Sequence, residues 1–314
     1  MSKPKKPLFS VKEIAFLTVP LLFVASLWVI PEPLYIVAYA SGKAGVCPLR
    51  QSVSIRQVVN ELNRTTESIA KQSTIEEKDS KRGLWRWKTP YGVFWAPPET
   101  SVPFLLSEQA TRIYGDGERR VRQGDVVLDC GANIGTFTRE ALSAGAKLVV
   151  AIEPSERNVE ALRSSFAQEI EQGKVIVYPK GVWHKEDVLK FFVYGNSALD
   201  SFVMTERVEE KDTKPHEVQL PVNSIDRIVA ELKLEKIDFI KMDIEGAERH
   251  AMEGAQATLA KFHPRMSIAL ENLPDDQYAV PPLVLKAWAG YRQECGRCTL
   301  APNGKIQPDV MFFY

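Results

Sequence analysis

The pattern of hydrophobic positions changes character near residue 124. From there to the C-terminus, short and almost wholly apolar runs alternate with longer stretches of helical spacing. Apolar runs of this length are typical of strands that are buried on both faces of a parallel sheet. We predict core strands at residues 126–130, 148–152, 175–178, 239–243 and 266–270, and helices at 155–170 and 247–262. The alternation predicts an α/β domain with a doubly wound, mostly parallel sheet.

Two features of this part depart from the plain alternation. Further strand candidates, residues 188–195 and 216–222, lie between the third and fourth core strands. The chain ends on two more strand candidates, residues 290–295 and 309–314, joined by a turn with Gly and Pro. We expect these last two to form an antiparallel edge of the sheet. An open sheet of this kind binds ligands beyond the carboxyl ends of its strands.

The segment before the sheet has its own elements. Residues 54–72 show helical spacing, and residues 75–83 read as a charged linker. In residues 84–98, Trp85 and Trp87 alternate with basic residues before a Pro-Gly turn and a second apolar run, which predicts a hairpin. We expect one face of the hairpin to pack on the main domain. Stacking on sugars or bases, or contact with a membrane interface, are the alternatives.

The N-terminus combines lysines with a long uncharged stretch. Residues 14–31 carry no charge, and a helix needs about 18 to 20 apolar residues to cross a bilayer. We predict a single membrane-anchoring helix. A cleaved signal peptide, with Ala38 and Ala40 as the small residues before the cut, and a buried helix are the alternatives. The numbers of basic residues before and after this uncharged stretch are nearly equal. They slightly favour an N-terminus on the cytoplasmic side of the membrane.

Charge and cysteine content narrow the choice of ligands. Forty basic residues balance 40 acidic ones, so no positive field collects nucleic acid, and we predict no nucleic-acid partner. Cys295 and Cys298 form a single CxxC, whereas a structural zinc site needs a second pair. We interpret them as two ordinary cysteines and predict no metal site. The redox state of the compartment stays open.

The first core strand ends in an unusual glycine turn. Asp129 is followed by Gly131, Asn133 and Gly135 at every second position. This spacing is neither the G-x-G-x-x-G of dinucleotide sites nor a P-loop, and the turn has no lysine for a phosphate. The ligand is therefore uncharged or cationic at this point. Asn133 suits the turn, because Asn tolerates left-handed backbone conformations.

Glu153 stands at the tip of the second strand, about 20 residues after the turn. An acidic residue at this place accepts hydrogen bonds from ribose hydroxyls. A nucleoside with a ribose, no pyrophosphate and a positive centre describes S-adenosylmethionine, which we predict as the cofactor. An NAD-dependent oxidoreductase is an alternative that the glycine spacing opposes.

Four motifs then follow one another: DCGANIGTF at 129–137, IEPS at 152–155, KGVWHKEDVLKFF at 180–192 and IDFIKMDIEGAE at 237–248. In this order and spacing they resemble the FkbM-type class I methyltransferases, over roughly residues 121–314. The resemblance implies a Rossmann-like sheet. It implies that Asp129, Gly131, Asn133 and Gly135 line the methionine end of S-adenosylmethionine and that Glu153 holds its ribose. The segment before Glu108 has no counterpart, which leaves the substrate open.

Methyl transfer to oxygen requires a positioned acceptor and a base that removes its proton. Asp243 at the tip of the fourth strand and Glu245 two residues on are our first candidates. Such a carboxylate pair can also hold a divalent metal, which nothing else in the sequence indicates. His184 is a second candidate base. Glu271 and Asn272, at the tip of the fifth strand, are candidates for orienting the acceptor.

The sequence thus predicts three parts: a basic N-terminus with a membrane anchor (1–42), a helical and hairpin accessory segment (43–115) and a methyltransferase domain (116–314). We predict an S-adenosylmethionine-dependent O-methyltransferase that acts on a hydroxyl of a sugar, glycolipid or secondary metabolite. The cofactor is made in the cytosol, so we expect the catalytic domain on the cytoplasmic side of the membrane, although the basic residues around the anchor slightly favour the other side. A non-enzymatic membrane adaptor that keeps the fold is the remaining alternative. The oligomeric state is not predicted.

Overall fold

The computed structural model describes residues 32–193, 200–203, 216–301 and 304–314. The predicted membrane anchor, residues 14–31, lies outside the described residues. Within the described ranges, no helix is both long enough and apolar enough to cross a membrane.

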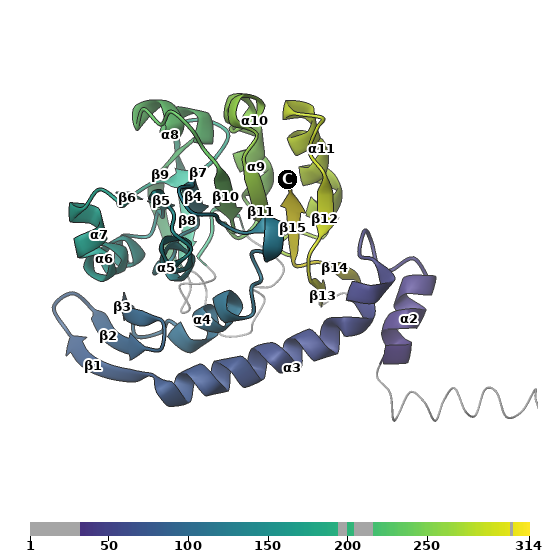
Figure 1. Ribbon diagram of the computed structural model, residues 1–314, viewed down its shortest axis with the longest axis horizontal. Coiled ribbons are helices and arrows are strands. Elements are labelled where there is room, and N and C mark those ends of the chain that lie inside the picture. The colour runs from purple at the N-terminus through teal and green to yellow at the C-terminus, as the bar shows by residue number, and fades with distance from the viewer. Residues whose placement is uncertain (1–31, 194–199, 204–215, 302–303) are drawn as a thin grey trace, which may run out of the picture.

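A seven-stranded sheet forms the centre of the molecule, in the order β12-β15-β11-β10-β4-β5-β6 (Figure 1). Its strands are β4 (Val126–Cys130), β5 (Leu148–Ile152), β6 (Val175–Tyr178), β10 (Phe239–Met242), β11 (Arg265–Ala269), β12 (Gln293–Cys295) and β15 (Val310–Phe313). Neighbouring strands pair in parallel, except that β15 runs antiparallel to both β11 and β12. The predicted parallel core and antiparallel C-terminal edge are confirmed. The strand order reverses between β4 and β10, where an open sheet binds its ligands.

Helices cover both faces of this sheet (Figure 1). One face carries α8 (Ile225–Glu231), α9 (Glu248–Glu253), α10 (Gln256–Phe262) and α11 (Asp276–Ala287), and the other carries α5 (Thr136–Ser143), α6 (Glu156–Ser165) and α7 (Ala167–Glu171). Neighbouring residues of β4 point to opposite faces: Leu128 packs with Ile228 of α8, and Val127 packs with Phe137 of α5. Burial on both faces explains why the core strands are almost wholly apolar in sequence.

Each of the two predicted long helices is divided in two. The first is interrupted at Phe166, whose side chain is fully buried between α6 and α7. The second is interrupted after Gly254, where an added Cβ would lie 2.5 Å from the carbonyl oxygen of Trp183. Tertiary packing therefore sets these breaks, and a helical pattern alone does not reveal them.

The two strand candidates between the third and fourth core strands do not join the central sheet. They form β8 (Asp187–Val193) and β9 (His216–Asn223), which build a separate three-stranded sheet with β7 (Gly181–Val182) in the order β7-β9-β8. A short hairpin of β13 (Cys298–Leu300) and β14 (Ile306–Pro308) precedes β15 and was not predicted.

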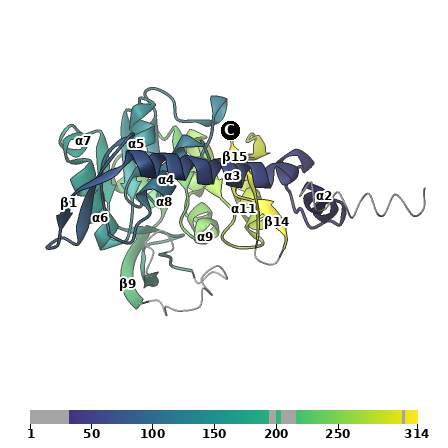
Figure 2. The ribbon, with the colours of Figure 1, turned by 90° about the horizontal axis from the view of Figure 1, so that it is seen from below.

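The N-terminal elements lie along the same domain. They are α2 (Glu32–Ala40), α3 (Leu49–Gln72), β1 (Thr74–Asp79), β2 (Leu84–Thr89), β3 (Gly92–Ala96), α4 (Val102–Ala110) and a 3₁₀ turn at Gly117–Arg119. The long helix α3 runs beside the domain, with α2 at one end and β1 at the other (Figure 1 and Figure 2). The predicted hairpin is β2 and β3, and its buried Leu84 and Phe94 pack with Leu162 of α6, as expected.

The interpretation of residues 75–83 as a charged linker is wrong. Most of this segment belongs to β1, which pairs antiparallel with β2. Glu76 forms an ion pair with Arg86, and Lys78 lies over the ring of Trp85, 4.3 Å from its centroid. Opposite charges and cation–π contacts across the two strands stabilise a strand that lacks apolar alternation.

The interpretation of Cys298 as an ordinary cysteine is also wrong, whereas Cys295 is a free thiol. A disulfide joins Cys298 to Cys47, at a sequence separation of 251 residues. Only the packing of the Ser41–Pro48 turn region against β13 brings these two residues together, so no local spacing rule predicts the pair.

Candidate active site

A cavity of about 300 Å³ lies at the carboxyl ends of β4, β5 and β10. The turn after β4, the tip of β5 and the segment after β10 form its floor. Phe104, Leu105 and Glu108 of α4 form one wall, and Val182 and Phe191 of the small sheet form another. The accessory helix α4 is therefore part of the site that the main domain builds.

The glycine turn has the left-handed backbone that the sequence predicts. The φ angles are 76° at Gly131, 50° at Asn133 and 90° at Gly135. The Asn133 side chain stabilises this conformation, because its Oδ1 accepts a hydrogen bond of 2.8 Å from the Ile134 amide. At Gly131 an added Cβ would lie only 1.8 Å from the carbonyl oxygen of Asp243. Glycine is required there because the turn lies directly against the end of β10.

Glu153 connects this turn to the second strand. Its Oε2 accepts a hydrogen bond of 2.9 Å from the Asn133 amide, and its Oε1 accepts one of 3.0 Å from the Ser155 amide. The carboxylate lines the cavity although it is nearly buried. Burial raises the pKa of Glu153, and the two backbone hydrogen bonds oppose that shift.

Asp129 and Gly135 are not among the residues that line the cavity, and their place at the methionine end of S-adenosylmethionine stays a prediction. Asp129 is fully buried beneath the turn and accepts a hydrogen bond of 2.7 Å from Thr138 Oγ1. Its Oδ1 lies 3.5 Å from Nζ of Lys241, which donates a hydrogen bond of 2.8 Å to the Gly131 carbonyl. Asp129 therefore stabilises the turn indirectly: it pairs with Lys241, and Lys241 donates a hydrogen bond to the turn.

The structure brings together two of the three predicted catalytic residues. Asp243 and Glu245 both line the cavity, and Asp243 Oδ2 accepts a hydrogen bond of 2.6 Å from the Tyr114 hydroxyl. Burial raises the pKa of Tyr114 well above its usual value, so the phenol remains a donor. His184 lies outside the wall, with its ring 5.7 Å from that of His250.

Two further carboxylates belong to the wall of the cavity. Glu271 lines the cavity as predicted, and Glu108 of α4 adds a residue that sequence reasoning missed. Burial, together with the charges of Asp243 and Glu271, raises the pKa of Glu108 to about 8. No spacing rule indicates that a helix ahead of the domain packs against the strand tips.

The cavity is acidic. Its wall contains Glu108, Glu153, Asp200, Asp243, Glu245 and Glu271. Lys241 is the one basic side chain among the described residues of the wall. Such a wall attracts a cationic ligand and repels a phosphate. In the described ranges, groups of three side chains close enough to share a metal ion occur at two places, and both lie away from this cavity.

Comparison with known proteins gives one family match. The Methyltransferase FkbM domain matches residues 129–295 of the chain. No curated protein sequence matches the chain.

Three solved methyltransferase structures that the chain resembles are distant from it in sequence. Methyltransferase FkbM from Methylobacillus flagellatus KT is 15% identical, with a TM-score of 0.45, and the match covers 88% of this chain and 65% of that one. A putative RNA methyltransferase from Pyrococcus horikoshii is 14% identical, with a TM-score of 0.33 and coverage of 81% of this chain and 94% of that one. A precorrin-6y C5,15-methyltransferase from Geobacter metallireducens GS-15 is 10% identical, with a TM-score of 0.34 and coverage of 62% and 80%.

The family match spans more than half of the 314 residues and includes the glycine turn, Glu153 and the Asp243–Glu245 segment. The chain belongs to the FkbM methyltransferase family.

Proposed function

We propose that this protein transfers a methyl group from S-adenosylmethionine to a hydroxyl oxygen of a small-molecule or glycan acceptor. The observation that carries the proposal is Glu153. Two backbone amides hold its carboxylate at the tip of β5, facing the cavity beside the Gly131 turn. An acidic side chain in this place is suited to accept the hydrogen bonds of ribose hydroxyls.

The other residues of the wall fit the same cofactor. S-adenosylmethionine supplies the methyl group on a positively charged sulfonium. Gly131 and Asn133 would approach its methionine part, and the acidic wall suits the sulfonium and ammonium groups. Lys241 would face the carboxylate. The wall thus pairs each charge of the cofactor with an opposite one.

The protein's own chemical task is to place the acceptor and receive its proton. Asp243 and Glu245 line the cavity and are the candidate proton acceptors, whereas Glu108, whose pKa is raised to about 8, holds its own proton at neutral pH. The Tyr114 hydrogen bond orients Asp243. The apolar rings of Phe104 and Phe191 offer surfaces on which an acceptor can pack.

The membrane anchor belongs to the same proposal. The uncharged segment, residues 14–31, supports it, and so does α2, which follows directly. Three of the α2 side chains are strongly exposed apolar groups, Ile36 at 49%, Val37 at 47% and Tyr39 at 43%. Such a surface suits the interface of a bilayer, and it favours a sugar or glycolipid acceptor near the membrane. The cytoplasmic placement of the catalytic domain remains a prediction from the supply of the cofactor.

Calorimetry of the full chain tests the cofactor assignment. We expect heat on titration with S-adenosylmethionine and none with NAD⁺. Glu153→Gln should weaken binding roughly 10-fold, because hydrogen bonds to a charged acceptor contribute about 1.5 kcal/mol or more. The exposed Glu235 provides the matched control, and Glu235→Gln should bind normally. Absence of heat with S-adenosylmethionine would overturn the proposal.

The acceptor needs a separate measurement. Mass spectra of glycans and lipids from cells with and without the gene should differ in one species by a single methyl group. If a nucleic acid or a protein is the species that changes, the proposed acceptor class is wrong.

A further inference from the structure

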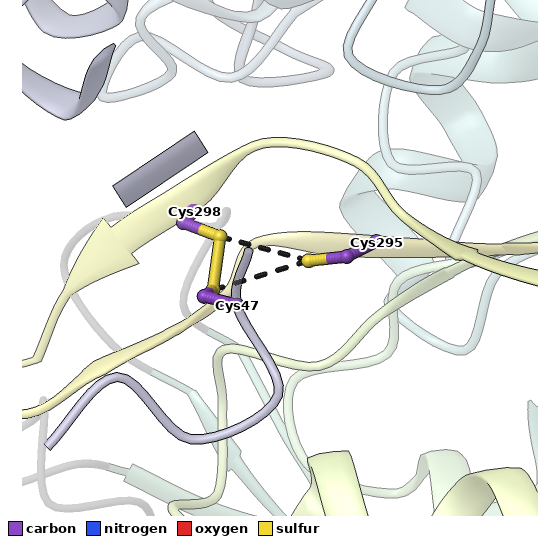
Figure 3. A group of neighbouring side chains, drawn as sticks. All are labelled: Cys47, Cys295 and Cys298. Atoms are coloured by element: carbon purple, nitrogen blue, oxygen red, sulfur yellow. Dashed lines mark hydrogen bonds between the residues drawn. A yellow bond between two sulfur atoms is a disulfide. The ribbon is translucent and has the colours of Figure 1, made fainter. Parts of the chain in front are cut away.

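Three of the four cysteines gather in one buried cluster away from the cavity (Figure 3). Cys47 lies just before α3, Cys295 ends β12 and Cys298 begins β13. Cys47 and Cys298 form the disulfide, while Cys295 is a free thiol. Its Sγ lies 3.6 Å from Sγ of Cys298 and 3.9 Å from Sγ of Cys47. The fold thus holds a third sulfur against a disulfide.

We propose that these cysteines are a thiol–disulfide exchange site, in which Cys295 replaces Cys47 as the disulfide partner of Cys298. The thiolate of Cys295 attacks Sγ of Cys298, and a Cys295–Cys298 bond forms as the Cys47–Cys298 bond breaks. The electron pair of the broken bond leaves with Cys47, which takes up the proton. One disulfide and one thiol are present before and after the step, so no oxidant or reductant is needed.

The surroundings favour this chemistry over a metal site. The cluster packs against the apolar side chains of Ala44, Ile55 and Ile306. Three thiolates around a divalent ion would leave a net negative charge in this apolar setting. The carboxylates of Asp309 and Glu294 lie close enough to Cys295 to disfavour further negative charge. A neutral disulfide beside a neutral thiol avoids this cost.

In this structure, burial and the position of Cys295 hinder its attack on the disulfide. Burial raises the pKa of Cys295 to about 12, so the thiol keeps its proton at neutral pH. Cys295 also lies at similar distances from both sulfurs, beside the disulfide and not in line with it. Exchange therefore requires a local movement that exposes and turns Cys295. We expect it to be slow at neutral pH and faster at alkaline pH.

The exchange changes how the N-terminal part is attached. After it, Cys47 no longer ties the start of α3 to β13. Hydrogen bonds such as that from the Ile306 amide to the Lys43 carbonyl, 2.9 Å, and from the Val46 amide to Gln277, 3.0 Å, then hold this end. The N-terminal segment can thus be bound covalently or by these weaker contacts alone.

Disulfide mapping of the full chain tests the proposal. The purified protein is kept at pH 9 for minutes to hours, the timescale of uncatalysed disulfide rearrangement, and then quenched with acid. Free thiols are blocked in denaturant, and the peptides are identified by mass spectrometry. We expect two isomers, one with Cys47–Cys298 and one with Cys295–Cys298. Cys130, buried in the main core, is the internal reference and should be a free thiol in both.

Two variants sharpen the test. The Cys295→Ser variant should contain the Cys47–Cys298 disulfide as its one isomer. The Cys47→Ser variant should form the Cys295–Cys298 disulfide instead. Circular dichroism checks that both variants fold. If Cys47→Ser does not fold, comparing the disulfide isomers of the wild type with those of Cys295→Ser still tests the proposal. A single disulfide isomer in the wild type after the alkaline incubation would overturn the proposal. Three reduced cysteines that hold a metal ion would overturn it as well.

Discussion

At the scale of single residues, the contact between Gly131 and Asp243 shapes the candidate site. Gly131 needs both a positive φ and the absence of a side chain, since a Cβ would overlap the Asp243 carbonyl. Gly173 is a matched position, because it also has a positive φ, 69°, but an added Cβ there would meet no atom within 4 Å.

We expect Gly131→Ala to lower the free energy of unfolding by about 3 kcal/mol or more, because strain and overlap act together. Gly173→Ala should cost only about 1 kcal/mol, since the backbone conformation alone opposes it. Urea denaturation of both variants measures the difference. Equal losses would show that the close approach to Asp243 is relaxed at little cost.

At the scale of elements, α4 joins the accessory segment to the site. Its Leu106 is buried in the core cluster with Phe94 and Leu162, whereas Phe104 is 38% exposed and lines the cavity. The Thr66 hydroxyl of α3 donates a hydrogen bond of 2.8 Å to the Ser107 hydroxyl, which fixes α4 against α3. The accessory segment thus packs as part of the main core and also supplies a wall of the cavity.

Substitutions on the two faces of α4 should separate these roles. Leu106→Ala should lower the free energy of unfolding by about 2 to 5 kcal/mol, because it opens a cavity in the core. Phe104→Ala should change stability by less than about 1 kcal/mol, because its ring is partly exposed already. Thermal and urea unfolding of both variants test the pair. A small effect of Leu106→Ala would indicate that α4 is not integrated into the core.

At the scale of the whole molecule, buried carboxyl groups predict how stability depends on pH. Burial raises the pKa of Glu248 to about 8 and that of Glu140 to about 7, and Glu108 also reaches about 8. The folded protein then holds protons that the unfolded chain has released above its ordinary carboxyl pKa. The free energy of unfolding therefore falls as pH rises from about 4.5 to about 8. His250 acts in the opposite direction, because burial lowers its pKa, but it is a single group.

Chemical denaturation at about pH 5.5, 7 and 8.5, two points within this window and one just above it, should show the highest stability at the lowest pH. Glu248→Gln should flatten this dependence, since it removes one of the shifted groups. The exposed Glu235→Gln should leave it unchanged. Stability that rises from pH 5.5 to 8.5 would contradict the protonated state of these carboxyls.

The disulfide also bears on the compartment. Stable structural disulfides are typical of oxidising compartments, whereas the supply of S-adenosylmethionine predicts a catalytic domain in the reducing cytosol. Disulfides found in reducing compartments are mostly transient or redox-sensing. The exchange proposed for Cys295 changes which cysteines are joined but keeps one disulfide in both states, so the disulfide favours an oxidising compartment and the cytoplasmic placement rests on the supply of the cofactor alone.

Features that depend on neighbours along the chain could be predicted from the sequence. Residues 126–130, 148–152 and 175–178 were predicted as strands with the bounds they have in the structure. The glycine turn, the left-handed Asn133 and the position of Glu153 at a strand tip also followed from local pattern. Apolar runs and backbone preferences act over a few residues, so they can be read without the fold.

Contacts between residues that are far apart in the sequence could not be predicted and depend on the fold. Lys241 reaches Asp129 and Gly131 because β10 pairs with β4, and Glu108 joins the site because α4 packs against the strand tips. The disulfide of Cys47 and Cys298, and the strand at Thr74–Asp79, likewise depend on partners that no local pattern names. Such contacts arise from strand order and helix packing. A given strand or helix could pack against many others in the chain, and its own sequence does not name the partner. The glycine turn was therefore predictable, whereas its stabilisation by Lys241 and Asp129, the wall of the cavity formed by α4 and the cysteine cluster were not.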